Sequence, residues 1–319
     1  MPPIDKKEGI EIAAETESKK NKDSKSKNEK GNAKTNANVI SEEDQELKDR
    51  LETCVKTLLN TESEASVTTQ IRLTSLDMII KELRTATSSM TSVPKPLKFL
   101  KPFFDSLKKL HEDLSKLTFD TVSDDNGNVN MDGETLDVSL LLLRARLADV
   151  MAVLSMTLGK QEERESLSFK LSGMKDYESL DSISSKSINE KTDEKQSINT
   201  KKDDNLGSWG HEFVRSLTGE IGQEYNDRVI AGADPDQDEP FQDLLSMVDV
   251  IVPFHMDHNA EAEAVDLLMD VQRLNKLLDL DAIDSKNYKR ICAYLIKTSD
   301  FQSDPDDLKV NQYYITLST

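Results

Sequence analysis

Apolar side chains recur every three or four residues along most of the chain beyond residue 40, which is the spacing of one buried face of an α-helix. The first such stripe follows Ser41-Glu-Glu-Asp44, a capping box that favours the start of a helix at Ser41. The members of this stripe are Leu47, Leu51, Cys54, Val55, Leu58 and Leu59. A second stripe, in a helix that should end in the polar stretch 85–92, consists of Ile71, Leu76, Ile79, Ile80 and Leu83.

Three prolines then interrupt the helical pattern, and a continuous helix cannot pass through all of them. Pro94, Pro96 and Pro102 predict a short turn followed by a helix that opens at Pro102. This helix should bury Phe103, Leu107, Leu110, Leu114 and Leu117. Residues 118–135 are typical of a polar loop, whereas 136–158 are apolar on most faces and predict the most buried helix. A shorter helix over 162–171 should stop at Gly173.

The helical period resumes after residue 205 in three further stretches. Trp209 shares the first stripe with Leu206, Phe213 and Leu217, which predicts that its ring is a buried structural anchor. Pro240 should open the next helix and Pro253 should end it, and Asn259 should cap the one after. The apolar positions of these later helices are Phe241, Leu244, Leu245, Val248, Ile251, Ala260, Ala264, Leu267, Leu268, Val271, Tyr288, Ile291, Cys292 and Leu295. Since period-two alternation is nowhere sustained, the sequence predicts an all-α fold of antiparallel helix pairs, a helical-repeat-like array.

Two stretches lack a periodic apolar face and therefore define the expected domain organisation. Residues 1–40 should be a disordered tail and 176–205 a low-complexity disordered insertion, because neither can offset the entropy of ordering. The insertion separates a helical region at 41–175 from a second part of that region at 206–319. A Lys cluster between Lys19 and Lys30 resembles a nuclear-import signal, but a solvating tail explains it more simply.

Composition narrows the possible partners. The chain has 319 residues, with 41 Lys plus Arg against 60 Asp plus Glu, a net charge of −19. Nucleic-acid affinity depends on basic residues that displace counterions, so nucleic acid is excluded as the expected partner. Cys54 and Cys292 both fall on apolar stripes, which suits reduced thiols in a reducing compartment. The most apolar run stops at Arg144 and is far too short to span a membrane, so we expect a soluble protein.

Few sequence patterns suggest a catalytic or metal-binding site. Of His111, His211, His255 and His258, only the last two form a close pair, and Glu261 and Glu263 follow it. A zinc hydrolase places its histidines at i and i+4 on one helix, whereas Pro253 and Asn259 suggest that this pair precedes a helix. Residues 128–133 imitate half of a calcium loop, but the first position is the neutral Asn128 and the twelfth is Ser139, so the closing Glu is missing.

Nucleophilic catalysis has no better support. Cys54 and Cys292 lie on buried stripes, and no Gly-x-Ser-x-Gly elbow occurs. The acidic residues Asp234, Asp236, Asp238 and Glu239 are typical of a solvated loop. We therefore assign no catalytic, cofactor-binding or metal-binding residue, and expect no cofactor.

Four segments resemble one family, the large non-ATPase scaffold subunit of the base of the 26S proteasome. They are SEEDQELKDRLE at 41–52, TSSMTSVPKPLKFLKP at 87–102, SWGHEFVRSLTGEIGQEY at 208–225 and IVPFHMDHNAEAEAVDLLM at 251–269. The segments occur in the family's order and span nearly all the expected helices, and a Lys-rich tail also occurs in the family. The loops at 118–135 and 176–205 look like insertions relative to the family's pattern.

The resemblance implies a non-enzymatic regulatory subunit, cytoplasmic and nuclear, that packs beside the ring of ATPases and supports degradation of ubiquitinated proteins. It also implies that ubiquitin and ubiquitin-like receptors dock on a toroid of helical repeats C-terminal to the region seen here, so no docking residue can be transferred. Two alternatives remain: an autonomous helical adaptor unrelated to proteolysis, and a helical metal-dependent hydrolase that uses His255 and His258.

Overall fold

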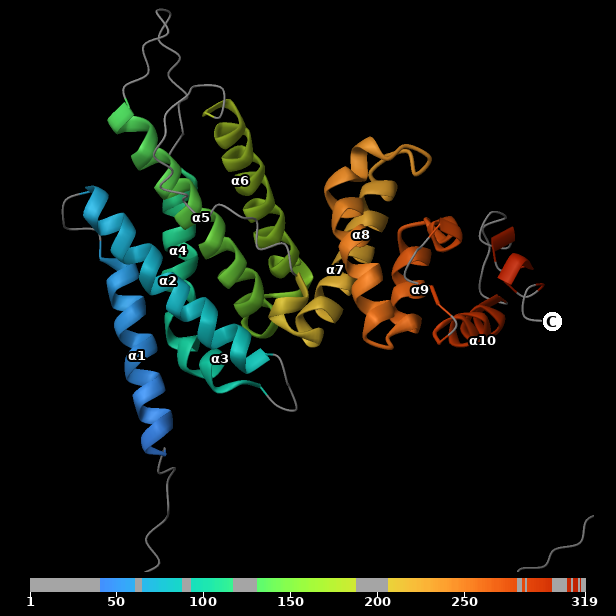
Figure 1. Cartoon of the computed structure of the whole chain (residues 1–319), viewed down its shortest axis with the longest axis horizontal. Helices are drawn as coiled ribbons and strands as arrows, with labels where there is room; N and C mark the ends of the chain where they lie inside the picture. The colour runs from blue at the N-terminus through green and yellow to red at the C-terminus, as the bar shows by residue number, and fades with distance from the viewer. Residues whose placement is uncertain are drawn as a thin grey trace, which may run out of the picture. The chain divides into compact units, whose positions relative to one another are not determined.

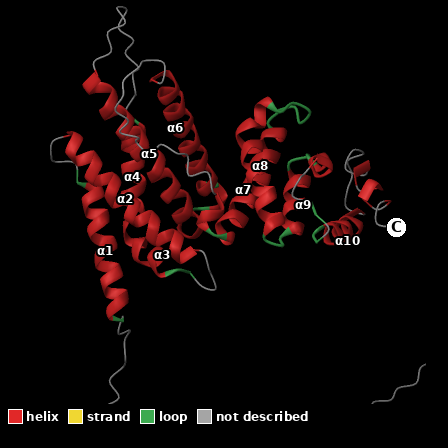
Figure 2. Ribbon diagram, in the orientation of Figure 1, coloured by secondary structure: helices red, strands yellow, loops and turns green. Residues whose placement is uncertain are grey.

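The chain folds into α-helices (Figure 1), and short 3₁₀ segments lie in several of the connections between them. The structure is a computed structural model that describes residues 41–60, 65–87, 93–116, 131–187, 206–279, 283–284, 286–299, 309–310, 312–314 and 316. These residues all belong to one compact unit, Ser41–Thr319. No strand occurs among them (Figure 2), which confirms the all-α prediction. None of the helices in this described part has the length and apolarity needed to cross a membrane.

Helix α1, Glu42–Leu59, begins where the capping box predicted. The Ser41 Oγ accepts a hydrogen bond from the Asp44 amide at 3.3 Å, while the Asp44 carboxylate accepts one from Lys95 Nζ at 2.7 Å. The predicted stripe faces the core: Leu51, Cys54, Val55 and Leu58 are buried, and Leu47 and Leu59 pack against them.

Helix α2, Ala65–Thr87, packs along α1 and corrects one prediction. Leu76, Ile79 and Leu83 are buried as expected, but Ile71 is 51% exposed. Arg72 takes the inward position instead, because its Nε donates a hydrogen bond to the Leu58 carbonyl at 2.9 Å. Simple periodicity could not anticipate that a guanidinium would satisfy the C-terminal end of α1.

The proline segment is more helical than predicted. Helix α3, Lys95–Leu100, begins directly after Pro94, and Pro96 lies in its first turn, where no intrahelical amide donor is needed. A 3₁₀ turn, η1 at Lys101–Phe103, leads into α4, Phe104–Ser115. The expected helix therefore starts two residues after Pro102, and a helix also forms before it. Leu107, Leu110 and Leu114 are buried as predicted, Phe103 is partly buried, and Leu117 lies outside the described residues.

Helices α5, Met131–Leu158, and α6, Glu165–Ser187, form the central pair, and both are longer than predicted. Helix α5 starts inside the expected polar loop and ends before Gly159. Helix α6 does not stop at Gly173 but passes through it, because that glycine lies where the two helices approach closely. A Cβ at Gly173 would lie 3.2 Å from the Ala148 Cβ and 3.3 Å from the Ala145 carbonyl oxygen.

The expected disordered insertion at 176–205 is accordingly wrong for its first part. Residues 176–187 belong to α6, and Asp176, Tyr177 and Leu180 are buried. The remaining part of the expected insertion, 188–205, lies outside the described residues, as does the expected tail at 1–40.

Buried polar groups fix α6 on α5. Arg144 donates two hydrogen bonds to the Asp176 carboxylate, at 2.6 and 2.8 Å. One turn away, Asp149 accepts hydrogen bonds from Lys170 Nζ at 2.6 Å and from the Tyr177 hydroxyl at 2.9 Å. Burial, and then the Asp149 charge, raise the pKa of Tyr177, so that the phenol remains a hydrogen-bond donor.

The remaining helices follow a 3₁₀ turn, η3 at Leu206–Trp209. They are α7 (His211–Ile230), η4 (Glu239–Phe241), α8 (Gln242–Asp257), α9 (Glu261–Asp270), η5 (Leu274–Asp279) and α10 (Tyr288–Thr298). Helix α9 contacts α7, α8 and α10. The predicted buried positions of this part are confirmed, with Tyr288 only partly buried.

Two boundaries in this part were predicted wrongly. Helix α8 continues through Pro253 to Asp257, because the turn beyond the proline buries His255 and Met256. The N-cap of α9 is Ala260 and not Asn259, whose backbone adopts a φ of 56°. The Asn259 Oδ1 instead accepts a hydrogen bond from Arg290 Nη2 at 3.0 Å, which connects the α8–α9 turn to α10.

The packing at Gly173 can be tested by comparison with Gly219, an α7 glycine with nothing within 4 Å of a built Cβ. We expect Gly173→Leu to lower the free energy of unfolding by about 1–3 kcal/mol, because the larger side chain must separate α5 from α6. Gly219→Leu should be neutral or stabilising by up to about 1 kcal/mol, since Leu favours a helix interior over Gly. Urea denaturation followed by circular dichroism measures both, and equal stabilities for the two variants would contradict the close approach.

Candidate functional site

The structure separates some of the sequence candidates and brings others together. His111 lies alone on α4, buried against the Phe169 ring at a centroid distance of 5.1 Å, and burial lowers its pKa. Asn128–Asn130 of the calcium-like segment lie outside the described residues, and Ser139 lies within α5. Cys54 and Cys292 are buried free thiols, as predicted. In the part of the chain that the structure describes, no three His, Cys, Asp or Glu side chains are grouped to hold a metal ion.

Three histidines converge although they lie far apart in sequence. His211 at the start of α7 contacts His255 of α8 and His258 just beyond it, with ring centroids 5.5 and 6.3 Å apart. Phe254 stacks on His258 at 4.0 Å, and the His258 Nδ1 lies 2.7 Å from the Phe254 carbonyl oxygen. The prediction that this pair precedes a helix is therefore incomplete, because His255 lies on α8 itself.

His255 is the buried centre of this histidine cluster. Its side chain is 0% exposed, and its Nε2 lies 3.2 Å from the Thr218 hydroxyl of α7. Burial and then the neighbouring His211 lower the pKa of His255 to about 4, so the imidazole is neutral at pH 7. A neutral ring with a hydroxyl partner joins α7 to α8 without a buried charge.

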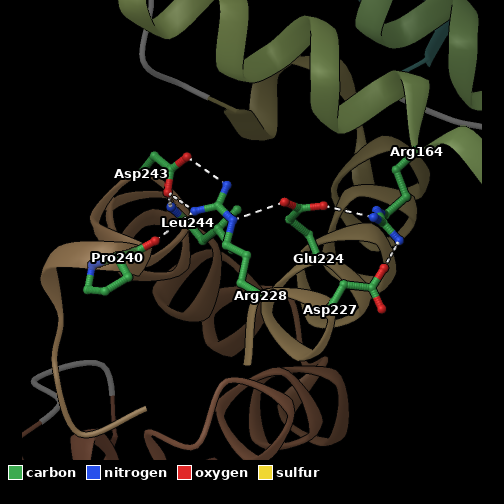
Figure 3. Close-up of polar contacts among 7 residues, drawn as sticks. All are labelled: Arg164, Glu224, Asp227, Arg228, Pro240, Asp243 and Leu244. Atoms are coloured by element: carbon green, nitrogen blue, oxygen red, sulfur yellow. Dashed lines mark hydrogen bonds and ion pairs between the residues drawn. The ribbon is translucent and has the colours of Figure 1, made fainter. Parts of the chain in front are cut away.

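A chain of ion pairs connects the start of α6 to α7, as Figure 3 shows. Arg164 follows the 3₁₀ turn η2, Gln161–Glu163, with a backbone φ of 45° that a non-glycine residue rarely adopts. Its guanidinium lies 2.9 Å from Glu224 Oε2 and 2.8 Å from Asp227 Oδ2, both on α7. The unusual backbone conformation directs the side chain toward α7, so the ion pairs compensate for its cost.

Arg228 extends the same network to α8. It donates two hydrogen bonds to the Asp243 carboxylate, at 2.6 and 2.9 Å, one to Glu224 at 2.9 Å and one to the Pro240 carbonyl at 2.9 Å. Burial alone would raise the pKa of Asp243, but the hydrogen bonds from Arg228 lower it below its usual range. The bond to Asp243 likewise raises the pKa of Arg228. This two-pronged geometry is the strongest form of side-chain ion pair.

Glu220 provides a third contact between α6 and α7. Its Oε2 accepts a hydrogen bond from the Leu167 amide at 2.7 Å, so a carboxylate on α7 satisfies one of the free amides in the first turn of α6. Burial raises the pKa of Glu220, while the Leu167 amide and Arg164 oppose that rise. We call Arg164, Glu220, Glu224, Asp227, Arg228 and Asp243 the α6–α7–α8 junction.

A second connection lies at η3, where the end of α2 meets the start of α7. Trp209 is 1% exposed, its ring lies edge-on to Phe213, and the Arg84 guanidinium stands 4.5 Å from its centroid. Gly210 has a φ of 90°, and a Cβ there would lie only 2.1 Å from the Thr87 carbonyl oxygen. Glycine is therefore required at this position, and Trp209 is confirmed as a buried anchor.

The junction, His255 and Trp209 each connect one helix to another. The ion pairs of the junction join its own residues, Glu220 accepts a hydrogen bond from the Leu167 amide, and the buried histidine and tryptophan contact neighbouring helices. The acidic loop at 234–239 is also tied back, because Arg273 donates hydrogen bonds to Asp238 and to the Pro235 carbonyl, at 2.7 and 2.8 Å. Sequence reasoning missed the junction, since its pairs are 4 to 63 residues apart and no local pattern marks them.

A double-mutant cycle tests the junction. Arg228→Ala and Asp243→Ala should each destabilise the chain, and their coupling energy should be about 1–2 kcal/mol because the pair is bidentate and partly buried. The exposed pair Lys116 and Asp113, three residues apart on one helix end, is the matched control and should show no measurable coupling. Additive effects at Arg228 and Asp243 would show that the pair does not hold α7 to α8.

The histidine cluster predicts a pH dependence. The pKa of His255 is about 4 in the folded chain, whereas its ordinary value is 6.5. Between pH 6.5 and 4 the unfolded chain therefore binds a proton at this residue that the folded chain does not bind. Stability should fall by at most about 3 kcal/mol between pH 6.5 and 4 on this account. We expect His255→Gln, which retains a polar partner for Thr218, to lose less stability across that window than the wild type. The exposed His258→Gln is the control, and an identical pH profile for His255→Gln and the wild type would contradict the assignment.

Known proteins resemble this chain over most of its length. It is 38% identical over 84% of its length to the 26S proteasome non-ATPase regulatory subunit 2 homolog A of Arabidopsis thaliana, covering 23% of that protein. It is 33% identical over 85% of its length to the 26S proteasome non-ATPase regulatory subunit 2 of Dictyostelium discoideum, covering 23% of that protein. A third relative is the 26S proteasome regulatory subunit RPN1 of Candida glabrata, at 34% identity over 88% of this chain and 24% of the relative. The chain thus spans about a quarter of the length of these relatives.

The family model described as the RPN1 N-terminal domain matches residues 51–318. That range begins in α1 and includes the helices up to α10, the α6–α7–α8 junction and the histidine cluster. It also contains three of the four segments on which the sequence resemblance rested, and part of the first. The chain therefore belongs to the RPN1 N-terminal domain family.

Proposed function

We propose that this chain acts as a non-catalytic scaffold in the base of the 26S proteasome regulatory particle and supports ATP-dependent degradation of ubiquitinated proteins. The observation that carries the proposal is the family match over residues 51–318, because relatives in this family are named as non-ATPase or regulatory subunits of the 26S proteasome. The location that follows is the cytoplasm and the nucleus.

The geometry supports a scaffold in a specific way. A scaffold must keep its binding surfaces at fixed positions, and this chain holds α6, α7 and α8 together through partly buried ion pairs and a backbone cap. Buried aromatic rings at Trp209 and Phe213 do the same between α2 and α7. These contacts resist relative movement of the helices, which suits a rigid part of an assembly better than a mobile lid.

The partners in this proposal are the other subunits of the base, including the ring of ATPases. In this proposal, ubiquitin and receptors with ubiquitin-like domains bind to helical repeats outside these 319 residues. An autonomous helical adaptor would share the fold but would have no reason to associate with the regulatory particle.

Co-purification tests the proposal directly. The tagged 319-residue chain, expressed in eukaryotic cells and purified gently, should recover base subunits in amounts quantified by mass spectrometry. A second variant, Trp209→Ala, removes the anchor between α2 and α7 and should weaken the recovery of base subunits, because the helices then lose their fixed positions. Recovery of the chain without any base subunit, while circular dichroism shows that it is folded, would contradict the proposal and favour the adaptor.

A further inference from the structure

An open groove of about 480 Å³ lies between helices α1 and α2. Glu46, Asp49, Arg50 and Thr53 of α1 form one side, Met78 of α2 forms the other, and Cys54 lies at the base. The two helices run antiparallel, because Arg50 pairs with Glu82 at one end and Arg72 bonds to the Leu58 carbonyl at the other. The groove therefore runs along the direction of both helices.

Met78 is the α2 residue that lines the groove, and a second exposed apolar residue, Ile71, lies further along α2 outside that lining. Met78 is 45% exposed and Ile71, seven residues earlier, is 51% exposed, although helical periodicity placed Ile71 in the core. Seven residues are close to two helical turns, so both side chains project from one face of α2, about 10 Å apart. Exposed aliphatic residues at heptad spacing beside a groove are the arrangement against which another helix packs its own apolar stripe. Methionine suits such a surface because its side chain adapts to varied partners.

Two acidic side chains that line the groove, Glu46 and Asp49, are available to a positively charged partner. Glu46 and Asp49 have no cationic partner among the described residues, whereas Arg50 is already paired with Glu82 at 3.5 Å. The Asp49 carboxylate accepts a hydrogen bond from the neutral Gln45 side chain at 2.8 Å, and the Thr53 hydroxyl donates to the Asp49 carbonyl. The groove thus combines two available carboxylates with an apolar wall. Burial raises the pKa of the Cys54 thiol, so the base of the groove remains uncharged.

We propose that the α1–α2 groove binds an amphipathic helix of another protein, one with apolar residues at heptad spacing and Lys or Arg residues flanking them. The apolar stripe of this helix packs on Met78 and Ile71 to form a three-helix layer with α1 and α2. Its basic residues pair with Glu46 and Asp49. A second copy of this chain is a poor occupant, because each copy carries a net charge of −19. The proposal stands on the groove itself and does not depend on the proposed function.

The probe is a fluorescein-labelled peptide of about three heptads, with Leu at the a and d positions and Lys at e and g. A companion peptide carries Glu at e and g. Fluorescence anisotropy against the full chain should give saturable binding of the Lys peptide with a Kd below about 100 μM. The Glu peptide should not saturate, and raising NaCl from about 50 to about 300 mM should weaken the Lys peptide several-fold.

Variants locate the site. Met78→Asp and the double variant Glu46→Lys/Asp49→Lys should each weaken the Lys peptide by about tenfold or more, and all three positions are exposed, so the fold should persist. Ile230→Asp, at an exposed apolar residue on α7, and Glu162→Lys/Glu178→Lys, with the same change in net charge, are the matched controls and should bind like the wild type.

Three results would overturn the proposal. The first is unchanged binding in Met78→Asp, which would place the peptide elsewhere. The second is equal weakening by the Glu162→Lys/Glu178→Lys control, which would show a nonspecific charge effect. The third is self-association of the wild type that Met78→Asp abolishes, since a second copy would then cover the groove.

Discussion

Helix α5 is apolar on nearly all its faces, so it must be surrounded, and this requirement organises the helices around it. Leu141–Leu143 and Val150–Leu154 are buried on different sides of the helix, which contacts α2, α4, α6 and α7. The closest of these neighbours is α6, and Gly173 permits that approach. Because α6 is held against α5 in this way, the start of α6 has a defined position. From there Arg164 pairs with Glu224 of α7, and the Leu167 amide donates a hydrogen bond to Glu220 of α7.

Electrostatics determine how an acidic chain maintains this arrangement. With a net charge of −19, the chain gains from placing its arginines where each neutralises several carboxylates. Arg164 and Arg228 share Glu224 and reach Asp227 and Asp243 as well, so two cations join three helices. Histidine is used differently: His255 is buried without charge and contributes packing and one polar contact to Thr218. The acidic rim of the α1–α2 groove stands apart because its carboxylates have no such partner among the described residues.

Much of the fold could be predicted from sequence, because one-sided burial leaves a repeating pattern. The stripes of α1, α4, α7, α8, α9 and α10 were predicted with few errors, and the resemblance in four segments identified the family. The errors share a physical cause, because tertiary contacts outweighed local signals. Close packing allowed α6 to continue through Gly173, and the burial of His255 and Met256 allowed α8 to continue through Pro253. At Asn259 the bond to Arg290 replaced the expected N-cap. The expected break at 176 failed similarly, since Asp176 and Tyr177 find buried partners on α5. The junction itself could not be predicted, because its pairs join distant residues without a motif.

We expect α1–α6 and α7–α10 to unfold as one cooperative unit, because the Trp209 anchor and the α6–α7–α8 junction connect them. The chain offers a natural probe, since its single tryptophan lies at the connection between the two helical groups. Equilibrium urea unfolding should be followed in parallel by Trp209 fluorescence, which reports on that connection, and by far-ultraviolet circular dichroism, which reports on all helices. A cooperative unit predicts one transition with the same midpoint for both signals. A fluorescence change completed at lower urea than the loss of helix would show that the connection opens while the two groups remain folded, and that they are not one cooperative unit.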